Sequence, residues 1–325
     1  MTTLLVTHPA SLGHVTPDGH PERIDRIRAI NQILSSEHFA DLIRREAPLG
    51  RDEDILHAHA VEHLERIRAV APAEGVEYLD PDTVMSPGSL EAALRAVGAA
   101  TAAVDAVFAG EADNAFCALR PPGHHAETRR AMGFCLFNQA AIAAHHARHR
   151  HGAERVAVID FDVHHGNGTQ DIFWSDAGMF YGSTHQMPLY PGTGSVQETG
   201  VGNIFNAPLR AGDGGAEFRE AMNSVILPAL DAFAPDLVVV SAGFDAHHRD
   251  PLGSLRLTEE DFAWVTLALM EAAEVHCGGR LVSVLEGGYD LQGLAASVGI
   301  HVQALMHGNA GDARDFTNDD EDDFS

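Results

Sequence analysis

The 325-residue chain contains no lysine, and its 21 residues of the lysine and arginine type are all arginines. This absence excludes two kinds of site, a Schiff base formed on lysine and the phosphate-binding lysine of a P-loop. Cysteine is also scarce, and Cys117, Cys135 and Cys277 match neither a zinc nor a redox spacing. We expect them to be reduced core residues, so that no disulfide framework forms.

Long apolar runs and positive charge are lacking as well. We expect no apolar stretch to span a bilayer, and the N-terminus has no basic segment followed by an apolar one. These features predict a cytoplasmic protein without a membrane partner. The formal net charge of −26 would repel phosphates, so direct binding of nucleic acid is not expected. The same charge weakly favours the approach of cationic substrates.

The composition changes only at the C-terminus. Residues 311–325 carry seven acids, one arginine and few apolar side chains, which predicts a disordered acidic tail. Residues 1–310 are expected to form a single catalytic domain, since an α/β fold often runs to this length. A homo-oligomer is left open, because an interface leaves no period in a sequence.

The body of the chain alternates helical and apolar segments. Helical periodicity predicts helices over 21–34, 89–110, 138–152 and 258–279. Short β-branched runs predict strands over 114–120, 155–163, 178–185, 236–245 and 280–289. Such nearly continuous apolar strands are buried on both faces, as in a parallel sheet covered by helices. The sequence therefore predicts a three-layer α/β fold with a mostly parallel central sheet.

Four of the predicted strands end in polar motifs, which are RPPGHHA, DFDVHHGNG, SAGFDAHH and LEGGYD. In open α/β sheets, binding sites form at the carboxyl ends of the strands. We therefore expect these four ends to converge on one crevice.

The first candidate group is a set of metal ligands. Asp162 and His164 lie two residues apart at a strand end, where alternate residues share a face. Asp245 directly follows an apolar strand, where an unpaired carboxylate is costly. A buried ion pair and a helix N-cap are the plainer interpretations of these groups. Together they form an Asp₂His set that suits zinc or another divalent ion and leaves one position open for water.

The second group can move protons. His124 and His125 follow a rigid Pro-Pro-Gly turn, and an imidazole there can take a proton from metal-bound water. Tyr289 follows two glycines and can donate a hydrogen bond to a developing oxyanion, although glycine–tyrosine turns are common. By contrast, we interpret four histidines on a polar helix end as solvated, namely His145, His146, His149 and His151.

A third group is aromatic. Phe134, which follows Gly133, and Tyr190 could line a narrow channel suited to an extended aliphatic chain. The alternative is that these aromatic side chains belong to the core.

Six motifs resemble, in order, those of the zinc-dependent histone deacetylase family: RPPGHHA, GFCLFN, DFDVHHGNGT, YPGTG, SAGFDAHHRDPLG and LEGGYDL. The resemblance extends from about His20 to about Leu294. Asn167 and Glu286 make the chain similar to class II deacetylases and their bacterial amidohydrolase relatives. The resemblance implies an arginase/deacetylase fold and hydrolysis of the amide of an acylated lysine, in a peptide or protein, or of an acetylated small amine.

The same resemblance implies the role of each site residue. The zinc ligands would be Asp162, His164 and Asp245, with ferrous iron as the alternative metal. His125 would be the general base, oriented by Asn167. His124, buttressed by Asp160, would stay near the leaving group, and Tyr289 would polarise the scissile carbonyl.

Further positions would bind potassium and substrate by this resemblance. The first potassium site would comprise Asp160, Asp162, His164, Ser183 and Thr184. A second, weaker monovalent site would comprise Phe173, Asp176, Met179 and Asn203. Substrate would contact Gly133, Phe134, Tyr190, Leu252 and Gly288. Arg23 matches an arginine near the internal product channel.

Three other functions compete with this interpretation. An acetylpolyamine amidohydrolase has the same chemistry, but some polyamine-selective relatives carry a glutamate where this chain has Leu252. A binuclear manganese ureohydrolase needs more carboxylates than DVHHG and the late Asp245 provide. A non-catalytic acyl-lysine binding protein would not need both histidines, the three ligands and Tyr289. The residues therefore favour a metal-dependent deacylase.

Overall fold

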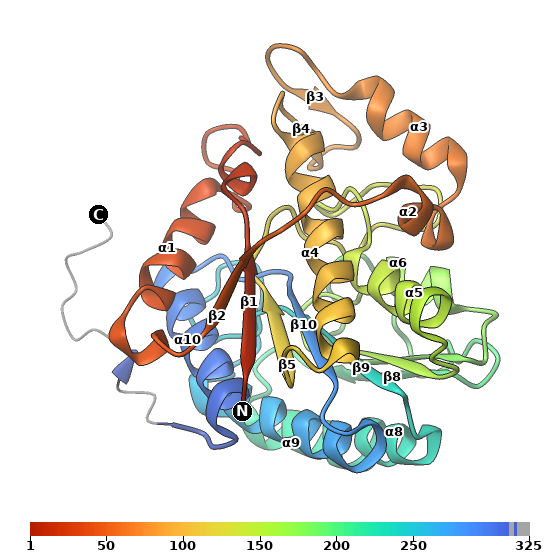
Figure 1. Cartoon of the computed structure of the whole chain (residues 1–325), viewed down its shortest axis with the longest axis vertical. Helices are drawn as coiled ribbons and strands as arrows, with labels where there is room; N and C mark the ends of the chain where they lie inside the picture. The colour runs from red at the N-terminus through yellow and green to blue at the C-terminus, as the bar shows by residue number, and fades with distance from the viewer. Residues whose placement is uncertain (312–314, 317–325) are drawn as a thin grey trace.

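The computed structural model describes residues 1–311 and 315–316, so the predicted acidic tail lies almost entirely outside the described residues. Among them, eight strands form one sheet in which every neighbouring pair is parallel (Figure 1). In spatial order the strands are β2 (Ile43–Glu46), β1 (Thr3–Thr7), β5 (Asn114–Cys117), β10 (Leu281–Leu285), β9 (Leu237–Ala242), β6 (Val156–Asp160), β7 (Met179–Gln186) and β8 (Ile204–Leu209). The predicted parallel α/β sheet is confirmed.

Helices connect the strands and cover both faces of the sheet. They are α1 (Ile24–Leu34), α2 (Asp52–Ala58), α3 (Val61–Val70), α4 (Ser89–Ala109), α5 (Gln139–His151), α6 (Asn167–Phe173), α7 (Gly215–Ala221), α8 (Leu227–Phe233), α9 (Glu259–Cys277) and α10 (Leu291–His307). A short antiparallel pair, β3 (Glu77–Tyr78) and β4 (Val84–Met85), lies beside α3 at the top of Figure 1. A π-helical turn, Met222–Ile226, joins α7 to α8, and 3₁₀ turns occupy Pro9–Leu12 and Glu37–Phe39.

Alternate residues of each central strand enter two separate cores. In β9, Val238 and Val240 pack with α1, α9 and α10, while Leu237 and Val239 pack with α4 and α5. This alternation is why the strands are apolar at nearly every position, as the sequence predicts for a sheet covered on both faces.

The predicted helices lie where expected and have clear ends. Asn138 caps α5 by accepting a hydrogen bond from the amide of Ala141 at 2.9 Å, and the helix ends at Gly152 in a left-handed conformation. Thr258 and Asp261 form a capping box at the start of α9. Three strands of the sheet were not predicted, namely β1, β2 and β8. Of these, the edge strand β2 carries no apolar run in its sequence, IRRE, and lies largely exposed.

Four predicted strands extend too far along the chain, since β5 ends at Cys117 and β10 at Leu285, where the sequence predicts strands up to 120 and 289. Likewise, β6 ends at Asp160 and β9 at Ala242, whereas the sequence predicts strands up to 163 and 245. The residues beyond these ends turn out of the sheet into the loops that carry the polar motifs. The site residues therefore belong to these loops at the carboxyl edge of the sheet.

Helix α4 corrects the expectation that no apolar stretch is long enough to cross a membrane. By length and composition alone it could do so, with a mean hydropathy of 1.5 over 18 residues. However, 67% of that window is buried, and its alanines pack against α5 and the sheet. The apolar character of α4 is thus explained by its place in the core.

Candidate active site

The four polar motifs follow strands that are neighbours in the sheet. β5, β10, β9 and β6 lie side by side in that order, although they come from distant parts of the chain (Figure 1). Because all four are parallel, the loops that follow them meet at one edge of the sheet. The predicted convergence is therefore observed.

The Asp₂His set forms a compact buried group. Nδ1 of His164 lies 3.1 Å from Oδ1 of Asp162 and 3.1 Å from Oδ2 of Asp245. The ligand atoms of all three residues lie within 4.8 Å of one another. Backbone amides hold both carboxylates, because Gly287 donates to Asp162 at 2.8 Å and Val163 to Asp245 at 2.7 Å.

The charges of this group suit a bound cation. Burial and the neighbouring charge of Asp162 raise the pKa of Asp245 to about 7. Burial disfavours the charged form of His164, but the two carboxylates outweigh it and raise its pKa to about 10. Two carboxylates and an imidazole nitrogen thus meet in a buried pocket that favours a positive charge. The donor set and its spacing fit a tetrahedral divalent ion such as zinc.

Gly287 permits the close approach of the last strand end to this group. A side chain at this position would collide with the carboxylates of Asp162 and Asp245. The first glycine of the LEGGYD motif is therefore required by the ligands it packs against.

The two tandem histidines have different partners. Nδ1 of His124 lies 2.9 Å from Oδ2 of Asp160, and Nδ1 of His125 lies 2.8 Å from Oδ1 of Asn167. Burial opposes a charge on His124, yet Asp160, Asp162 and Glu286 raise its pKa well above 6.5. Burial and the nearby charge of His124 lower the pKa of His125 well below 6.5. One ring therefore favours the charged form and the other the neutral form.

Asn167 is itself held in place by Glu127, which was not predicted. The amide nitrogen of Asn167 donates to Oε1 of Glu127 at 2.7 Å. This bond fixes which end of the amide faces His125, so that the oxygen accepts the Nδ1–H of the ring. The other nitrogen of His125, Nε2, is then left as an acceptor.

Tyr289 lies over a buried arginine that the sequence analysis passed over. The Arg26 guanidinium lies 4.8 Å from the centre of the Tyr289 ring and donates to the carbonyls of Gly288 and Glu286, each at 2.6 Å. Burial raises the pKa of Tyr289 well above 10, so the phenol keeps its proton. Gly288 thus serves the site through its backbone.

Arg23, the predicted product-channel residue, lies at the surface. Its side chain is 51% exposed, and its nearest carboxylate is that of Asp25 at 3.8 Å. Arg26, one helical turn later, is the arginine that reaches the site and is fully buried. The PERIDR segment offers two arginines three residues apart, and only the packing of α1 decides which one faces inward.

Two buried carboxylates hold the loops together, and neither was assigned this role from the sequence. Oε2 of Glu286 accepts hydrogen bonds from the amides of Gly123 and His124, at 2.6 and 3.1 Å. Burial raises the pKa of Glu286 to about 7. Asp250 accepts hydrogen bonds from the amides of Leu252 and Tyr289, at 3.0 and 2.6 Å. Glu286 and Asp250 lie inside the polar motifs. Only their position close to the site residues in the sequence could have indicated this role.

A cavity of about 260 Å³ leads to the Asp₂His group. Its lining brings together predicted and unpredicted residues: His125, Gly133, Phe134, His164, Tyr190, Leu252 and Tyr289, with Asp82 and Leu189 in addition. The ring of Phe134 lies edge-on to Tyr289 at 5.9 Å, and that of Tyr190 edge-on to His125 at 5.2 Å. The two aromatic side chains therefore line the channel and do not belong to the core.

The residues of the first predicted potassium site also come together. Asp160, at the end of β6, is paired in register with Ser183 within β7, and both are fully buried. Among the described residues, Oγ1 of Thr184 is buried and has no hydrogen-bond partner. A buried, oxygen-rich environment with an unpaired oxygen fits a monovalent cation.

The residues of the second predicted monovalent site also lie together, with an amide nitrogen among the carbonyl oxygens. The side-chain nitrogen of Asn203 lies 2.9, 3.1 and 2.8 Å from the carbonyl oxygens of Phe173, Asp176 and Met179. Its Oδ1 accepts the amide of Val201 at 3.1 Å, which fixes the orientation of the side chain. The amide nitrogen thus takes the place at which these three carbonyls converge.

The prediction that the histidines of α5 are all solvated is wrong. His149 is exposed, but His146 is only 3% exposed on its side chain, and His145 and His151 are partly buried. His146 is hydrogen-bonded to Asp54 and Asp105. The error arises because α4 and α2, both distant in sequence, cover this end of α5.

The fold and the site define an α/β enzyme whose polar groups lie at the carboxyl ends of parallel strands. The profile of the Histone deacetylase domain matches residues 20–305. The chain is 44% identical to a histone deacetylase-like amidohydrolase of Pseudomonas aeruginosa, over 87% of this chain and 74% of that one. It is 38% identical to a probable deacetylase of Archaeoglobus fulgidus, over 95% and 87% of the two chains.

A solved structure gives the same result. The crystal structure of the HDA15 HD domain superposes with a TM-score of 0.89 at 35% identity, covering 94% of this chain and 89% of that one. The chain belongs to the histone deacetylase family and has its arginase/deacetylase fold. It is a hydrolase of the deacetylase and amidohydrolase type.

Proposed function

We propose that this protein is a metal-dependent deacylase that hydrolyses the amide between a short acyl group and a primary amine such as the lysine side chain. The observation that carries the proposal is the cavity that reaches His125, His164 and Tyr289 together. In it, a proton acceptor, a metal-ligand group and a hydrogen-bond donor face the same small volume.

Asp162, His164 and Asp245 would hold the divalent ion, zinc or ferrous iron. Such an ion, when bound, supplies a Lewis acid for the acyl carbonyl and lowers the pKa of a water molecule. The first potassium site, built around Asp160 and Ser183, would lie directly behind this group and offset its buried negative charge.

His125 is the proposed general base. Its Nδ1–H is held by Asn167 at 2.8 Å, so that Nε2 can accept a proton from the attacking water. The lowered pKa of the ring keeps it neutral before the reaction. The oxygen of the water then bonds to the acyl carbon.

His124 is the proposed acid. Its raised pKa keeps it protonated, and Asp160 fixes the ring through Nδ1. As the carbon–nitrogen bond breaks, the departing amine takes a proton from this charged histidine pair. The products are a carboxylate and a free amine.

Tyr289 is the proposed oxyanion donor. Its hydroxyl stays protonated, its ring packs on the Arg26 guanidinium, and its backbone amide is held by the Asp250 carboxylate. A donor that is already in position stabilises the tetrahedral oxyanion without reorganisation during the step.

The channel suggests the substrate. Phe134 and Tyr190 form aromatic walls suited to a methylene chain, and Leu252 adds an apolar side chain to the lining. This lining favours acyl-lysine. Asp82 also lines the cavity, and its carboxylate could attract a second, free ammonium group. That single observation keeps an acetylpolyamine as the second candidate substrate.

The test is a comparison of kcat/KM for an acetyl-lysine peptide and for mono-acetylated polyamines, using enzyme with a defined metal content. We expect a preference for the peptide. Tyr289→Phe should lower kcat roughly 100- to 1,000-fold with unchanged metal content, since one oxyanion donor is lost. Full activity of both Tyr289→Phe and His125→Ala would refute the mechanism. Absence of turnover on every acylated amine would indicate a binding protein.

A further inference from the structure

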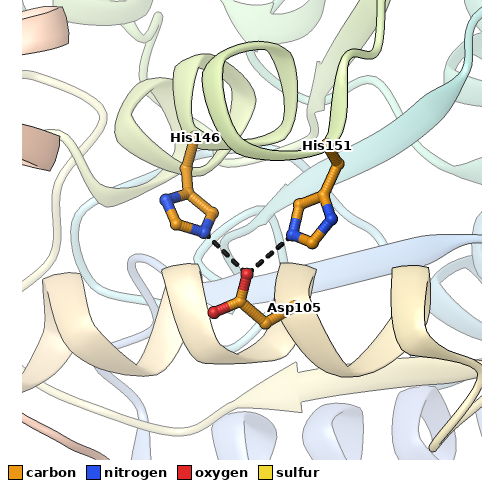
Figure 2. Close-up of side chains that lie close together, drawn as sticks. All are labelled: Asp105, His146 and His151. Carbon is orange, nitrogen blue, oxygen red and sulfur yellow. Dashed lines mark hydrogen bonds and ion pairs between the residues drawn. The ribbon is translucent and has the colours of Figure 1, made fainter.

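We propose that Asp105, His146 and His151 form a second binding site for a divalent transition-metal ion, separate from the active site, where α4 packs against α5. Figure 2 shows both imidazole rings of α5 directed at the same carboxylate of α4. The three ligand atoms lie within 4.8 Å of one another, and among the described residues only the active-site triad forms another group of this kind.

The two rings converge on a single oxygen atom. Oδ1 of Asp105 lies 2.9 Å from Nε2 of His146 and 2.6 Å from Nε2 of His151. Two imidazole nitrogens and a carboxylate are the ligands that zinc and its neighbours among the transition metals prefer. Asp105 is 52% exposed, so water can complete the coordination from the solvent side.

Each ring is held in this orientation by a further contact. Nδ1 of His146 lies 2.8 Å from Oδ1 of Asp54, a carboxylate that is in turn bound by Arg51 through two hydrogen bonds. A carboxylate behind a ligating histidine is the usual support in metal sites, because it fixes the tautomer that presents Nε2 to the ion. His151 is fixed by stacking on Phe108, with ring centres 4.6 Å apart.

The arrangement requires a positive charge between the rings and the carboxylate. His146 lies between two carboxylates, and a neutral imidazole has only one N–H to donate. If Nδ1 donates to Asp54, Nε2 carries a lone pair that faces a lone pair of Asp105. Either an additional proton or a metal ion must lie there, and a single divalent ion satisfies both histidines and Asp105 together.

This site is separate from the active site. Asn138, at the start of α5, contacts Ala126 in the loop after His125 and Thr169 in α6. His151 ends the same helix, and a rise of about 1.5 Å per residue places it about 18 Å along the axis from Gln139. A metal ion here would cross-link the far end of α5 to α4.

The experiment counts metal ions on the full-length, tag-free protein. After equilibration in buffers of defined free Zn²⁺, the wild type should retain one more zinc ion per chain than Asp105→Asn or His151→Gln. The difference is one ion whatever the active site holds. The same two variants should lose the additional thermal stabilisation that micromolar Zn²⁺ gives the wild type, while turnover on an acylated amine stays unchanged. Both positions are partly exposed, so these variants are expected to fold.

Two control variants test whether the additional zinc ion depends on Asp105 and His151 specifically. His276→Gln removes a surface histidine bonded to one carboxylate, Asp231 at 2.8 Å, and should leave the count unchanged. His149→Gln removes a neighbouring exposed histidine that stacks on His57, and should also retain the extra ion. An equal zinc count in wild type and Asp105→Asn would overturn the proposal and leave a protonated ion-pair cluster. Loss of the ion in His149→Gln but not in Asp105→Asn would overturn it as well, by locating the ion elsewhere on α5.

Discussion

Nδ1 of His125 lies 2.8 Å from the amide oxygen of Asn167, so the proposed general base is backed by a neutral group, whereas His124 is backed by the carboxylate of Asp160. Two adjacent histidines are thereby given opposite tendencies to hold a proton. The low proton affinity of His125 depends on the side-chain amide of Asn167. A substitution at this position should therefore change the pH dependence of catalysis.

Asn167→Asp should shift the acidic limb of the pH profile of kcat/KM to higher pH. The wild-type environment lowers the pKa of His125, so the base is neutral over a wide range. A carboxylate at 167 would stabilise the charged ring and raise its pKa by about one to three units. The base would then be lost by protonation as the pH falls through this higher value.

The control for this variant uses Glu127, because a second carboxylate would face it. Asn167→Asp combined with Glu127→Gln keeps a hydrogen bond between the two side chains and avoids the repulsion of two carboxylates. The limb should shift in the double variant too. A profile identical to the wild type in both proteins would argue against His125 as the titrating base.

Glu127 should act on catalysis through position alone. Glu127→Ala frees the amide of Asn167 to rotate, so that its nitrogen can face His125 in place of its oxygen. We expect kcat to fall roughly 10- to 100-fold, as for other residues that orient a catalytic group, with little change in KM. Glu127→Gln retains an acceptor oxygen and should restore most of kcat, whereas a purely electrostatic role would leave it as impaired as the alanine variant.

Arg26 and Arg23 form a matched pair for testing the arginine near Tyr289. Arg26→Met removes the hydrogen bonds to Gly288 and Glu286 and leaves Glu22 short of one cation. Unfolding free energy should fall by on the order of 3 kcal/mol, and kcat should fall with it as the Tyr289 loop loosens. Arg23→Met should stay within about 0.5 kcal/mol of the wild type. Urea unfolding and steady-state kinetics on both variants measure these effects. A larger loss of stability or kcat in Arg23→Met than in Arg26→Met would contradict the prediction.

We expect the amide nitrogen of Asn203 to replace a potassium ion at the second monovalent site. Asn203→Ala removes one hydrogen-bond donor from each of the carbonyls of Phe173, Asp176 and Met179, at a cost of about 1–3 kcal/mol in total. The space vacated by the amide nitrogen then becomes available to potassium. We expect the melting temperature of the variant to rise more steeply with K⁺ concentration than that of the wild type.

Asn206→Ala is the control, since Asn206 is another buried asparagine in the same segment and contacts Gln170 at 2.8 Å. It should lose stability without gaining a response to K⁺. If the wild type and Asn203→Ala respond to K⁺ identically, the amide nitrogen is not a substitute for the ion.

Most of the architecture could be predicted because burial on both faces leaves a clear signature. The central strands β6, β9 and β10 are apolar at nearly every position, and the long helices end at glycines with left-handed backbone, so pattern alone located them. The exposed edge strand β2 has no such signature. The polar motifs at the strand ends likewise predicted a shared site, because parallel strands present their carboxyl ends to one edge.

The sequence by itself predicted the proposed chemistry: Asp162, His164 and Asp245 as a ligand set, the histidine pair, and Tyr289 after its two glycines. These assignments depend on residue type and local spacing, which the chain carries without folding. Tertiary structure alone decided which of two arginines lies behind Tyr289, that Asn203 fills a carbonyl cluster, and that His146 is buried between Asp54 and Asp105. Each of these depends on side chains brought together from distant segments, because the orientation of a helix against its neighbours is fixed by packing and not by the period of its own sequence.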